Sequence, residues 1–179
     1  LANVMCIIAN KGYYYTPHFV DSIENETTDD TVFLGKYRKK HFVTHISNED
    51  FEAVQLAMLD VTREGTAVGA QIEGIDICAK TGTAQNPHGK NHSLFVAFAP
   101  MQDPKIAIAV VIENAGYGAT WAAPIASLMM EKYLNDTISA KRLPNLEKLA
   151  NADLIPAEIK HWYAKQDSIK MAKLAKQID

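Results

Sequence analysis

The sequence predicts an α+β fold: an antiparallel β-meander with helices on both faces, followed by a helical C-terminal tail. Three apolar segments predict the strands of the meander, and they cover residues 75–79, 93–99 and 105–112. Their connections are short, and short connections force neighbouring strands to run antiparallel. Helical patterns precede and follow the three strands, so we expect helices to cover both faces of the sheet.

The first forty residues predict a helix, an extended segment and a hairpin. Apolar residues at helical spacing over residues 1–8 predict a helix that ends near Gly12. The aromatic run over residues 13–20 is typical of an extended strand that packs on a core. An acidic run at 24–30 and a basic run at 36–40 flank a short apolar piece, and this pattern predicts a hairpin with charged ends.

The best-defined helix begins after Ser47. Residues Ser47 to Asp50 resemble a capping box, in which the first and fourth residues satisfy each other's backbone N–H groups. The predicted buried face of this helix is apolar and consists of Phe51, Val54, Met58 and Val61. Gly65 is expected to end the helix.

A further helix is expected after the meander, with Thr120 as its N-cap and Pro124 in its first turn. Beyond it, the sign of the charge changes. From Thr137 onward the chain holds eight Lys and Arg against five Asp and Glu. We therefore divide the chain into a domain at 1–136 and a basic helical tail at 137–179.

The tail contains a helix-prone stretch from Pro156 to Gln177 with clustered Ile159, Trp162 and Tyr163. Two interpretations of this stretch remain open. In the first, it is a structural terminus that either packs on the domain as a helix or is partly ordered. In the second, it is a basic helix that lies on a membrane surface.

Composition limits the function classes. The 179 residues carry a net charge of -3, which argues against a dedicated nucleic-acid binder because phosphate neutralisation needs a basic surface. No apolar run approaches the length of a membrane-spanning helix. The chain begins at Leu1 in sequence typical of a helix interior, which leads us to expect a piece of a longer protein. Cys6 and Cys78 lie in apolar patterns and predict two buried free thiols rather than a disulfide.

The chemistry-bearing motif is Lys80-Thr81-Gly82-Thr83, at the end of the first predicted strand of the meander. An ammonium and a hydroxyl can bind an anionic group of a substrate, and Gly82 lacks a Cβ, so a peptide can approach the strand edge closely. This arrangement suggests acyl transfer on a peptide-like substrate. Simple alternation places Lys80 and Thr81 on opposite faces of the sheet, so both serve one site only if the strand borders a cleft.

A longer pattern accompanies this motif and resembles one protein family. Its parts are Lys80-Thr81-Gly82-Thr83-Ala84-Gln85, Phe98-Ala99-Pro100, Ile112-Glu113-Asn114, Leu1-Ala2-Asn3, Ile8-Ala9-Asn10-Lys11-Gly12 and Tyr15-Thr16-Pro17-His18. Over about residues 1–134 the chain resembles the C-terminal part of the transpeptidase domain of class B penicillin-binding proteins, of the penicillin-binding protein 2 type. The resemblance implies part of a serine β-lactamase/transpeptidase-like fold.

The resemblance also implies a function. The longer protein would be a serine-type D,D-transpeptidase, anchored in the bacterial inner membrane and facing the periplasm, that cross-links peptidoglycan stem peptides and is acylated by β-lactams. Cell-elongation proteins would be its partners, and no cofactor or metal would be needed. Lys80 would act electrostatically, Thr81 would bind the substrate or antibiotic carboxylate, Gly82 would permit close approach, and Thr83 would supply a backbone N–H to the oxyanion hole.

The nucleophile of such an enzyme is absent from these 179 residues. None of the six serines begins a Ser-x-x-Lys or Ser-x-Asn motif. We therefore predict that the chain alone neither turns over substrate nor is acylated by penicillin. Two alternatives remain: a penicilloyl-sensing or β-lactamase relative of the same fold, and a non-catalytic interaction module.

Two rival motifs point to other chemistry. Residues Gly74 to Thr81 differ from a P-loop only by Ala79 in place of the second glycine, but the strand pattern at 75–78 does not suit a flexible phosphate-binding loop. Histidines four residues apart, as zinc ligands on a helix are spaced, occur at His41 and His45 and at His88 and His92. Neither pair lies in a convincing helical pattern, so surface or loop histidines are favoured.

Overall fold

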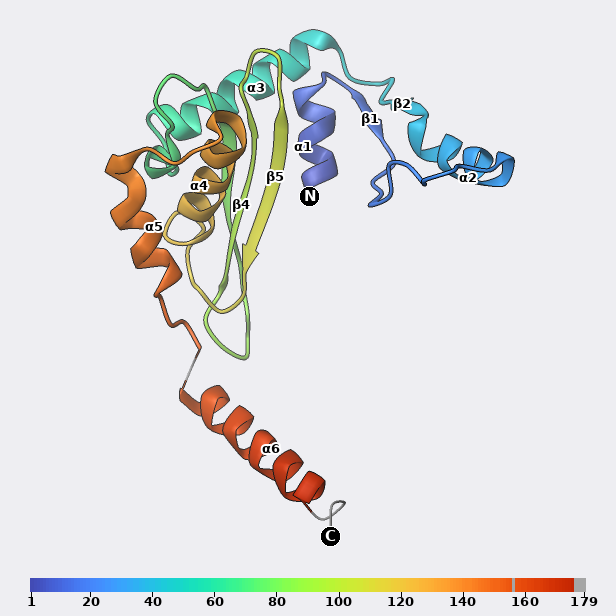
Figure 1. The fold of residues 1–179 in the computed structure, drawn as a ribbon. Coiled ribbons are helices and arrows are strands. Elements are labelled where there is room, and N and C mark those ends of the chain that lie inside the picture. The colour runs from blue at the N-terminus through green and yellow to red at the C-terminus, as the bar shows by residue number, and fades with distance from the viewer. Residues whose placement is uncertain (156, 176–179) are drawn as a thin grey trace. The chain divides into compact units, whose positions relative to one another are not determined.

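The computed structural model describes residues 1–155 and 157–175, and Figure 1 shows their elements. The chain forms two compact units, Leu1–Leu149 and Ala150–Asp179. The functional division at residue 136 stays a prediction. Among the described residues, every strand lies in the first unit, which also holds the Lys80-Thr81-Gly82-Thr83 motif.

A three-stranded antiparallel sheet forms the centre of the first unit. Its strands are β3 (Cys78–Ala84), β4 (His92–Ala99) and β5 (Ile106–Ile112), in the spatial order β3-β4-β5. The predicted meander is therefore confirmed. β3 begins three residues later than the alternating pattern suggested, so the Lys-Thr-Gly-Thr motif lies inside the strand and does not follow it.

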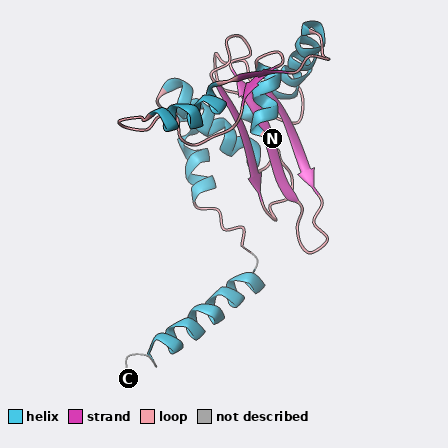
Figure 2. Cartoon of the chain, turned by 90° about the vertical axis from the view of Figure 1, so that its right-hand side faces the viewer, coloured by secondary structure: helices cyan, strands magenta, loops and turns pink. Residues whose placement is uncertain are grey.

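One face of the sheet is covered by helix α4 (Ala122–Asn135), as the elements in Figures 1 and 2 show. This interface is rich in alanine and contains Ala79, Ala97, Ala99, Ala122, Ala123 and Ala126 beside Phe95 and Met130. Small side chains let a helix approach a sheet closely, and the few large side chains fill the remaining space.

The opposite face is covered by α1 (Ala2–Ala9) and α3 (Asn48–Arg63). Its buried side chains are larger and include Met5, Met58, Leu59, Cys78 and Phe98. The prediction of helices on both faces is therefore confirmed. Cys78 and Ala79 are both fully buried although they point to opposite faces, so the start of β3 is enclosed on both sides and is not half-exposed.

Helix α3 begins as predicted, because Ser47 and Asp50 form a complete capping box. Its buried face differs from the predicted one. Val61 is only half-buried, and Leu59 and Thr62 are buried. Val54 is 44% exposed, and Gln55 is buried in its place. The Gln55 amide donates hydrogen bonds to the carbonyl oxygens of Ile8 and Ala9, at 2.7 and 3.2 Å, and thereby ties α3 to the end of α1. A buried polar group with such partners avoids the cost of desolvation.

Residues 13–43 form a segment that we call the N-terminal arm. It contains strand β1 (Tyr13–Tyr15), helix α2 (Thr28–Arg38) and strand β2 (Lys40–Phe42), and β1 pairs with β2 antiparallel. The predicted hairpin between the acidic and basic runs is wrong, since this stretch is α2. A second capping box, between Thr27 and Asp30, starts the helix. The acidic and basic runs lie at its N- and C-terminal ends, where they complement the helix dipole.

The start of α4 also differs from the prediction. Thr120 is not its N-cap: Trp121 occupies that position and makes no side-chain capping bond. Instead, the backbone N–H of Ala123 donates to the Gly118 carbonyl at 2.9 Å. The remaining elements of this unit are the short 3-10 helices η1 (Val68–Ala70) and η2 (Ala140–Arg142) and the helix α5 (Leu143–Ala150).

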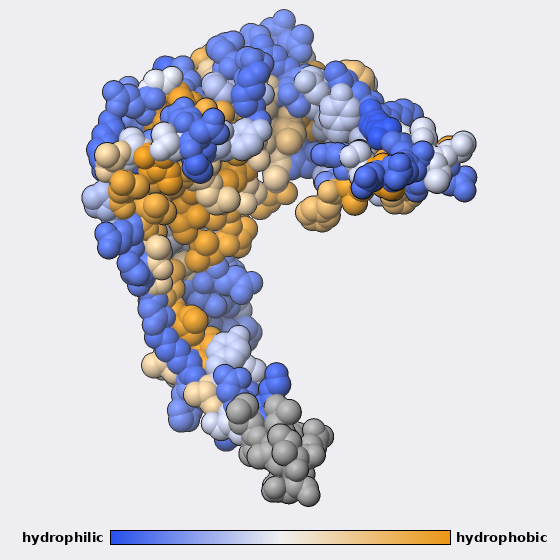
Figure 3. All heavy atoms as spheres, in the orientation of Figure 1, coloured by the Kyte–Doolittle hydropathy of each residue, from blue (hydrophilic) through white to orange (hydrophobic). Residues whose placement is uncertain are grey.

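The second unit contains the helix α6 (Ala157–Ala175), so a helical tail is confirmed in this part. Pro156 and Gln177, which the sequence suggested as its ends, lie outside the described residues. Ile159, Trp162 and Tyr163 are exposed. Among the described residues, every helix is too short or too polar to cross a lipid bilayer. In the first unit, Figure 3 shows apolar residues gathered over the central strands, where Val111 of β5 is half-exposed.

Candidate functional site

The Lys80-Thr81-Gly82-Thr83 motif lies on an edge of the central sheet. β3 pairs with β4 on one side only, and no other described strand pairs with its second side. Lys80 and Thr83 are exposed, and Thr81 and Gly82 are half-buried. An edge strand presents unpaired backbone N–H and C=O groups to which an extended peptide can bond. The motif is therefore accessible from the open side of the strand.

The side chain of Lys80 reaches the backbone of its neighbour. Its ammonium donates a hydrogen bond to the Thr81 carbonyl oxygen at 2.8 Å, although the two side chains start from opposite faces of β3. A long flexible lysine stem thus brings the positive charge beside Thr81 despite the alternation of the strand. The ammonium therefore lies beside the Thr81 backbone, while the Thr81 side chain leaves the strand on the other face.

The Thr81 hydroxyl has a partner that the sequence did not identify. Its Oγ1 lies 2.7 Å from Oγ1 of Thr66, which is in the turn between α3 and η1. Nothing in the sequence marks Thr66, because a threonine in a polar turn has no distinguishing pattern. The structure therefore adds a second hydroxyl to the candidate site.

Gly82 is approached closely, but by the chain itself. Gly118, in the loop before α4, is buried against β3 and β4. A Cβ on Gly118 would lie 2.1 Å from the Leu94 carbonyl oxygen and 2.6 Å from that of Gly82. A Cβ on Gly82 would lie 3.3 Å from Leu94 Cβ. The stricter requirement for glycine is therefore at position 118, which the sequence did not select.

Two buried or half-buried polar groups hold the loop that contains Gly118. The Ser93 hydroxyl donates to the Tyr117 carbonyl at 2.8 Å and accepts from the Ala122 N–H at 3.1 Å. Ser93 is the cross-strand partner of Thr83, so these bonds lie beside the end of the motif. The Asn114 N–H also donates to His92 Nδ1, at 3.1 Å. The loop that packs beside Thr83 is consequently fixed by hydrogen bonds.

The geometry does not support the P-loop-like motif or the two histidine pairs. Lys80 and Thr81 lie inside a β-strand and not in a loop that opens a helix, which excludes the P-loop interpretation. Neither histidine pair lies on a helix, because His41 belongs to β2 and His92 to β4. Over residues 1–155 and 157–175 no three His, Cys, Asp or Glu side chains are grouped as metal ligands.

Both thiols are free, as the sequence predicted, but only Cys78 is fully buried, and Cys6 is half-buried. Burial, together with the nearby Asp76 carboxylate, raises the pKa of the Cys78 thiol to about 12. Burial also raises the pKa of Cys6. Because the thiolate is the reactive form, neither cysteine is suited to act as a nucleophile.

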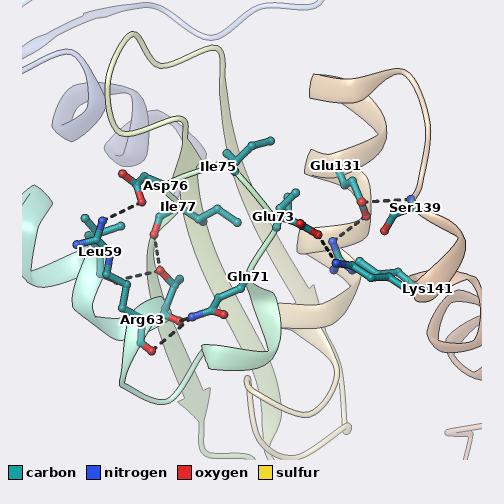
Figure 4. A pocket seen from close by; sticks show the side chains of 14 residues that line it. Leu59, Arg63, Gln71, Glu73, Ile75, Asp76, Ile77, Glu131, Ser139 and Lys141 are labelled. Carbon is teal, nitrogen blue, oxygen red and sulfur yellow. Dashed lines mark hydrogen bonds and ion pairs between the residues drawn. The ribbon is translucent and has the colours of Figure 1, made fainter.

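A cavity of about 730 Å³ lies at the beginning of β3, between the end of α3, residues 71–77 and η2. Figure 4 shows Glu73 and Lys141 pointing toward one another across it, and they form an ion pair. A second pair, between Arg142 and Glu131 at 2.7 Å, is almost completely buried. None of the four motif residues lines this cavity, so it is distinct from the candidate site.

Comparison with known proteins identifies similar chains. The sequence model of the family described as penicillin binding protein transpeptidase domain matches residues 1–131. The peptidoglycan D,D-transpeptidase MrdA of Haemophilus influenzae is 30% identical over 169 residues, which is 83% of this chain and 24% of that protein. The chain therefore spans about a quarter of the length of this curated relative.

Solved structures agree with these matches. Pseudomonas aeruginosa PBP2 in complex with WCK 5153 aligns with a TM-score of 0.63 and 26% identity, over 86% of this chain and 31% of that one. The imipenem acyl-enzyme complex of penicillin-binding protein A from Mycobacterium tuberculosis aligns with a TM-score of 0.60 and 29% identity, over 74% and 29%. The fold is thus the one expected for the serine β-lactamase/transpeptidase-like class.

Proposed function

The chain belongs to the penicillin-binding protein transpeptidase family, as a class B member of the penicillin-binding protein 2 type, and we propose that it forms one wall of a peptidoglycan D,D-transpeptidase active site. The observation that carries this proposal is the position of Lys80-Thr81-Gly82-Thr83 on the open edge of β3. There an extended stem peptide can pair with the strand while its charged end meets the lysine and threonine.

Each motif residue has a proposed role in acyl transfer. The Lys80 ammonium would attract the terminal carboxylate of the stem peptide, and the Thr81 hydroxyl would donate a hydrogen bond to it. Gly82 would leave room for the peptide backbone. The Thr83 N–H would donate to the carbonyl oxygen that becomes negatively charged when the nucleophile attacks, which is the charge that an oxyanion hole stabilises. A β-lactam carries a carboxylate and a reactive carbonyl and would occupy the same positions.

The nucleophile would come from outside these 179 residues. Ser93 and Ser127 are buried and bonded to backbone groups, so neither is placed to attack a substrate. We propose that a serine in a further part of a longer protein forms the acyl-enzyme. That serine would attack the D-alanyl carbonyl and release the terminal D-alanine, and an amine of a second stem peptide would then take the acyl group.

The same family membership supports a proposed setting for the longer protein. Its substrates would be stem peptides of the peptidoglycan, and β-lactams would inhibit it. It would face the periplasm from a membrane anchor that is not part of this chain. Proteins of the cell-elongation machinery would be its partners.

Covalent labelling by a fluorescent penicillin tests this proposal. The folded chain of residues 1–179, incubated with the penicillin and then denatured by heating in detergent, should carry no label. The longer protein should be labelled, and Lys80→Ala should slow its labelling by about 100-fold, the effect typical of losing one electrostatic contact to the reacting group. Lys105→Ala, which removes an exposed lysine just before β5, is the matched control and should label normally.

Two results would contradict the proposal. Labelling of the isolated chain would show that it contains a nucleophile of its own. Normal labelling of the Lys80→Ala protein would remove the lysine from the site. If the unmodified longer protein carried no label, a non-catalytic interaction module would be the better interpretation.

A further inference from the structure

The hydroxyl groups of Thr66 and Thr81 lie 2.7 Å apart. We propose that Thr66 is a positioning residue that orients the Thr81 hydroxyl toward the carboxylate of the acyl donor. This inference rests on the proposed function of Thr81. It adds a residue that lies outside β3, in the turn between α3 and η1.

The turn that contains Thr66 is held on both sides by backbone hydrogen bonds. The Gly65 N–H donates to the Asp60 carbonyl at 3.0 Å, and the Ala67 N–H donates to the Val61 carbonyl at 2.9 Å. A Cβ on Gly65 would lie 2.8 Å from Val61 Cα, so the turn is packed directly against α3. Ala67 is almost fully buried. Thr66 is therefore exposed but has little freedom to move.

A second set of hydrogen bonds holds the far end of the same loop. The Ser127 hydroxyl, on α4, donates to the Ala70 carbonyl of η1 at 2.6 Å. The Arg142 guanidinium donates to the Ser127 hydroxyl at 2.6 Å and to the Glu131 carboxylate at 2.7 Å. Because Glu131 is buried and Arg142 is largely shielded from water, this network is rigid and ties η1 to α4. The loop that carries Thr66 is thus fixed to two helices of the domain.

The chemistry of hydroxyl groups sets the direction of the hydrogen bond when ligand is bound. Each hydroxyl has one hydrogen to donate and can accept at its oxygen. A carboxylate can only accept, so Thr81 must donate its hydrogen to the ligand. Thr66 must then donate to the oxygen of Thr81. The result is a chain from Thr66 through Thr81 to the carboxylate, in which each bond polarises the next.

The arrangement also explains how Thr81 can discriminate without being buried. A free hydroxyl rotates and donates to water in several directions. A hydrogen bond from Thr66 to the Thr81 oxygen leaves the single hydroxyl hydrogen of Thr81 free to donate and restricts the direction in which that hydrogen points. The Lys80 ammonium, bonded to the Thr81 carbonyl at 2.8 Å, places a positive charge on the same residue.

Acylation rates of the longer protein test this inference, with benzylpenicillin and its methyl ester as probes. The ester keeps the reactive β-lactam and lacks the charged carboxylate. Thr66→Val, which keeps the shape of the side chain without the hydroxyl, should slow acylation by benzylpenicillin about tenfold and leave the ester rate unchanged. Thr66→Ser should restore most of the benzylpenicillin rate. Thr44→Val, which removes an exposed hydroxyl elsewhere in the chain, should have no effect on either probe.

The other outcomes separate the possible failures. Equal slowing of both probes by Thr66→Val, with or without a lower melting temperature, would mean a structural role and overturn the inference. An unchanged benzylpenicillin rate would also overturn it. Thr81→Val supplies the remaining control, since it should slow benzylpenicillin alone. If Thr81→Val slows neither probe, the proposed carboxylate role of Thr81 fails. If Thr81→Val slows acylation by benzylpenicillin and Thr66→Val does not, only the role of Thr66 fails.

Discussion

The central sheet and the N-terminal arm use similar residues in opposite ways. Phe95 of β4 is completely buried between the sheet and α4. Phe19 of the arm is fully exposed, and the aromatic rings around it pair with one another, as His18 and Tyr37 do with centroids 4.9 Å apart. In Figure 1 the arm elements β1, β2 and α2 lie to one side of α1. The sheet is therefore stabilised by burial, and the arm by local contacts.

This difference has a functional counterpart. The candidate site lies on β3, whose beginning is enclosed on both faces and whose end is an open edge. A rigid base and an accessible edge are what a site that binds an extended peptide requires. The arm contributes no motif residue, and a local change in it should leave the site intact.

The largest expected difference between the regions comes from removing one aromatic ring. Phe95→Ala should lower the free energy of unfolding by about 3–5 kcal/mol, because it leaves a large cavity in the core. Phe19→Ala should change it by less than about 0.5 kcal/mol, as is usual for an exposed site. Urea denaturation of the two variants, followed by circular dichroism, measures both. Similar losses in the two variants would show that the arm packs on a core after all.

Adding one methyl group should have opposite effects in the two regions. Gly118→Ala should destabilise the domain by about 2–3 kcal/mol, because its Cβ would collide with two backbone carbonyl oxygens that cannot move away easily. Gly35→Ala in α2 meets no atom within 4 Å and should stabilise that helix by about 0.5–1 kcal/mol. Thermal unfolding reports the first change and helical content the second. A Gly118→Ala protein as stable as the original would disprove the close packing of this loop on β3.

The smallest effects concern the two capping boxes. Ser47→Ala removes the cap of α3 and should lower the stability of the whole domain by about 1 kcal/mol. Thr27→Ala removes the cap of α2 and should only increase fraying of that helix, since α2 has one buried residue, Leu34. Amide hydrogen exchange distinguishes the two results. Faster exchange throughout the central strands of the Thr27→Ala protein would argue against an independent arm.

The capping carboxylate of α2 adds a pH dependence to the same comparison. Hydrogen bonds from the Thr27 hydroxyl and N–H hold the pKa of Asp30 below its ordinary value of 3.8. The folded helix therefore favours the ionised form, and its support is complete above pH 3.8 and is lost as the pH falls through the lowered value. The protection of α2 amides from exchange, relative to an unfolded chain at the same pH, should fall over that acidic range, and Asp30→Asn should remove this dependence.

Some elements were predictable because their signals are local. The capping box at Ser47 and the apolar segments of the meander need only residues a few positions apart, and both predictions were confirmed. The box at Thr27 was missed because the charges around it resembled hairpin ends. The cap at Thr120 was wrong because Ala123 bonds to the Gly118 carbonyl, and the position of that loop depends on its packing.

The sequence by itself determined the layered α+β architecture and the motif Lys80-Thr81-Gly82-Thr83, because strand periodicity and residue chemistry are readable along the chain. Only the tertiary structure decided what surrounds the motif. Thr66 meets Thr81 and Gly118 meets Gly82 because α3 and the loop before α4 pack on the same sheet. Such contacts depend on how helices and loops fit against the strands, and no short-range pattern encodes that fit.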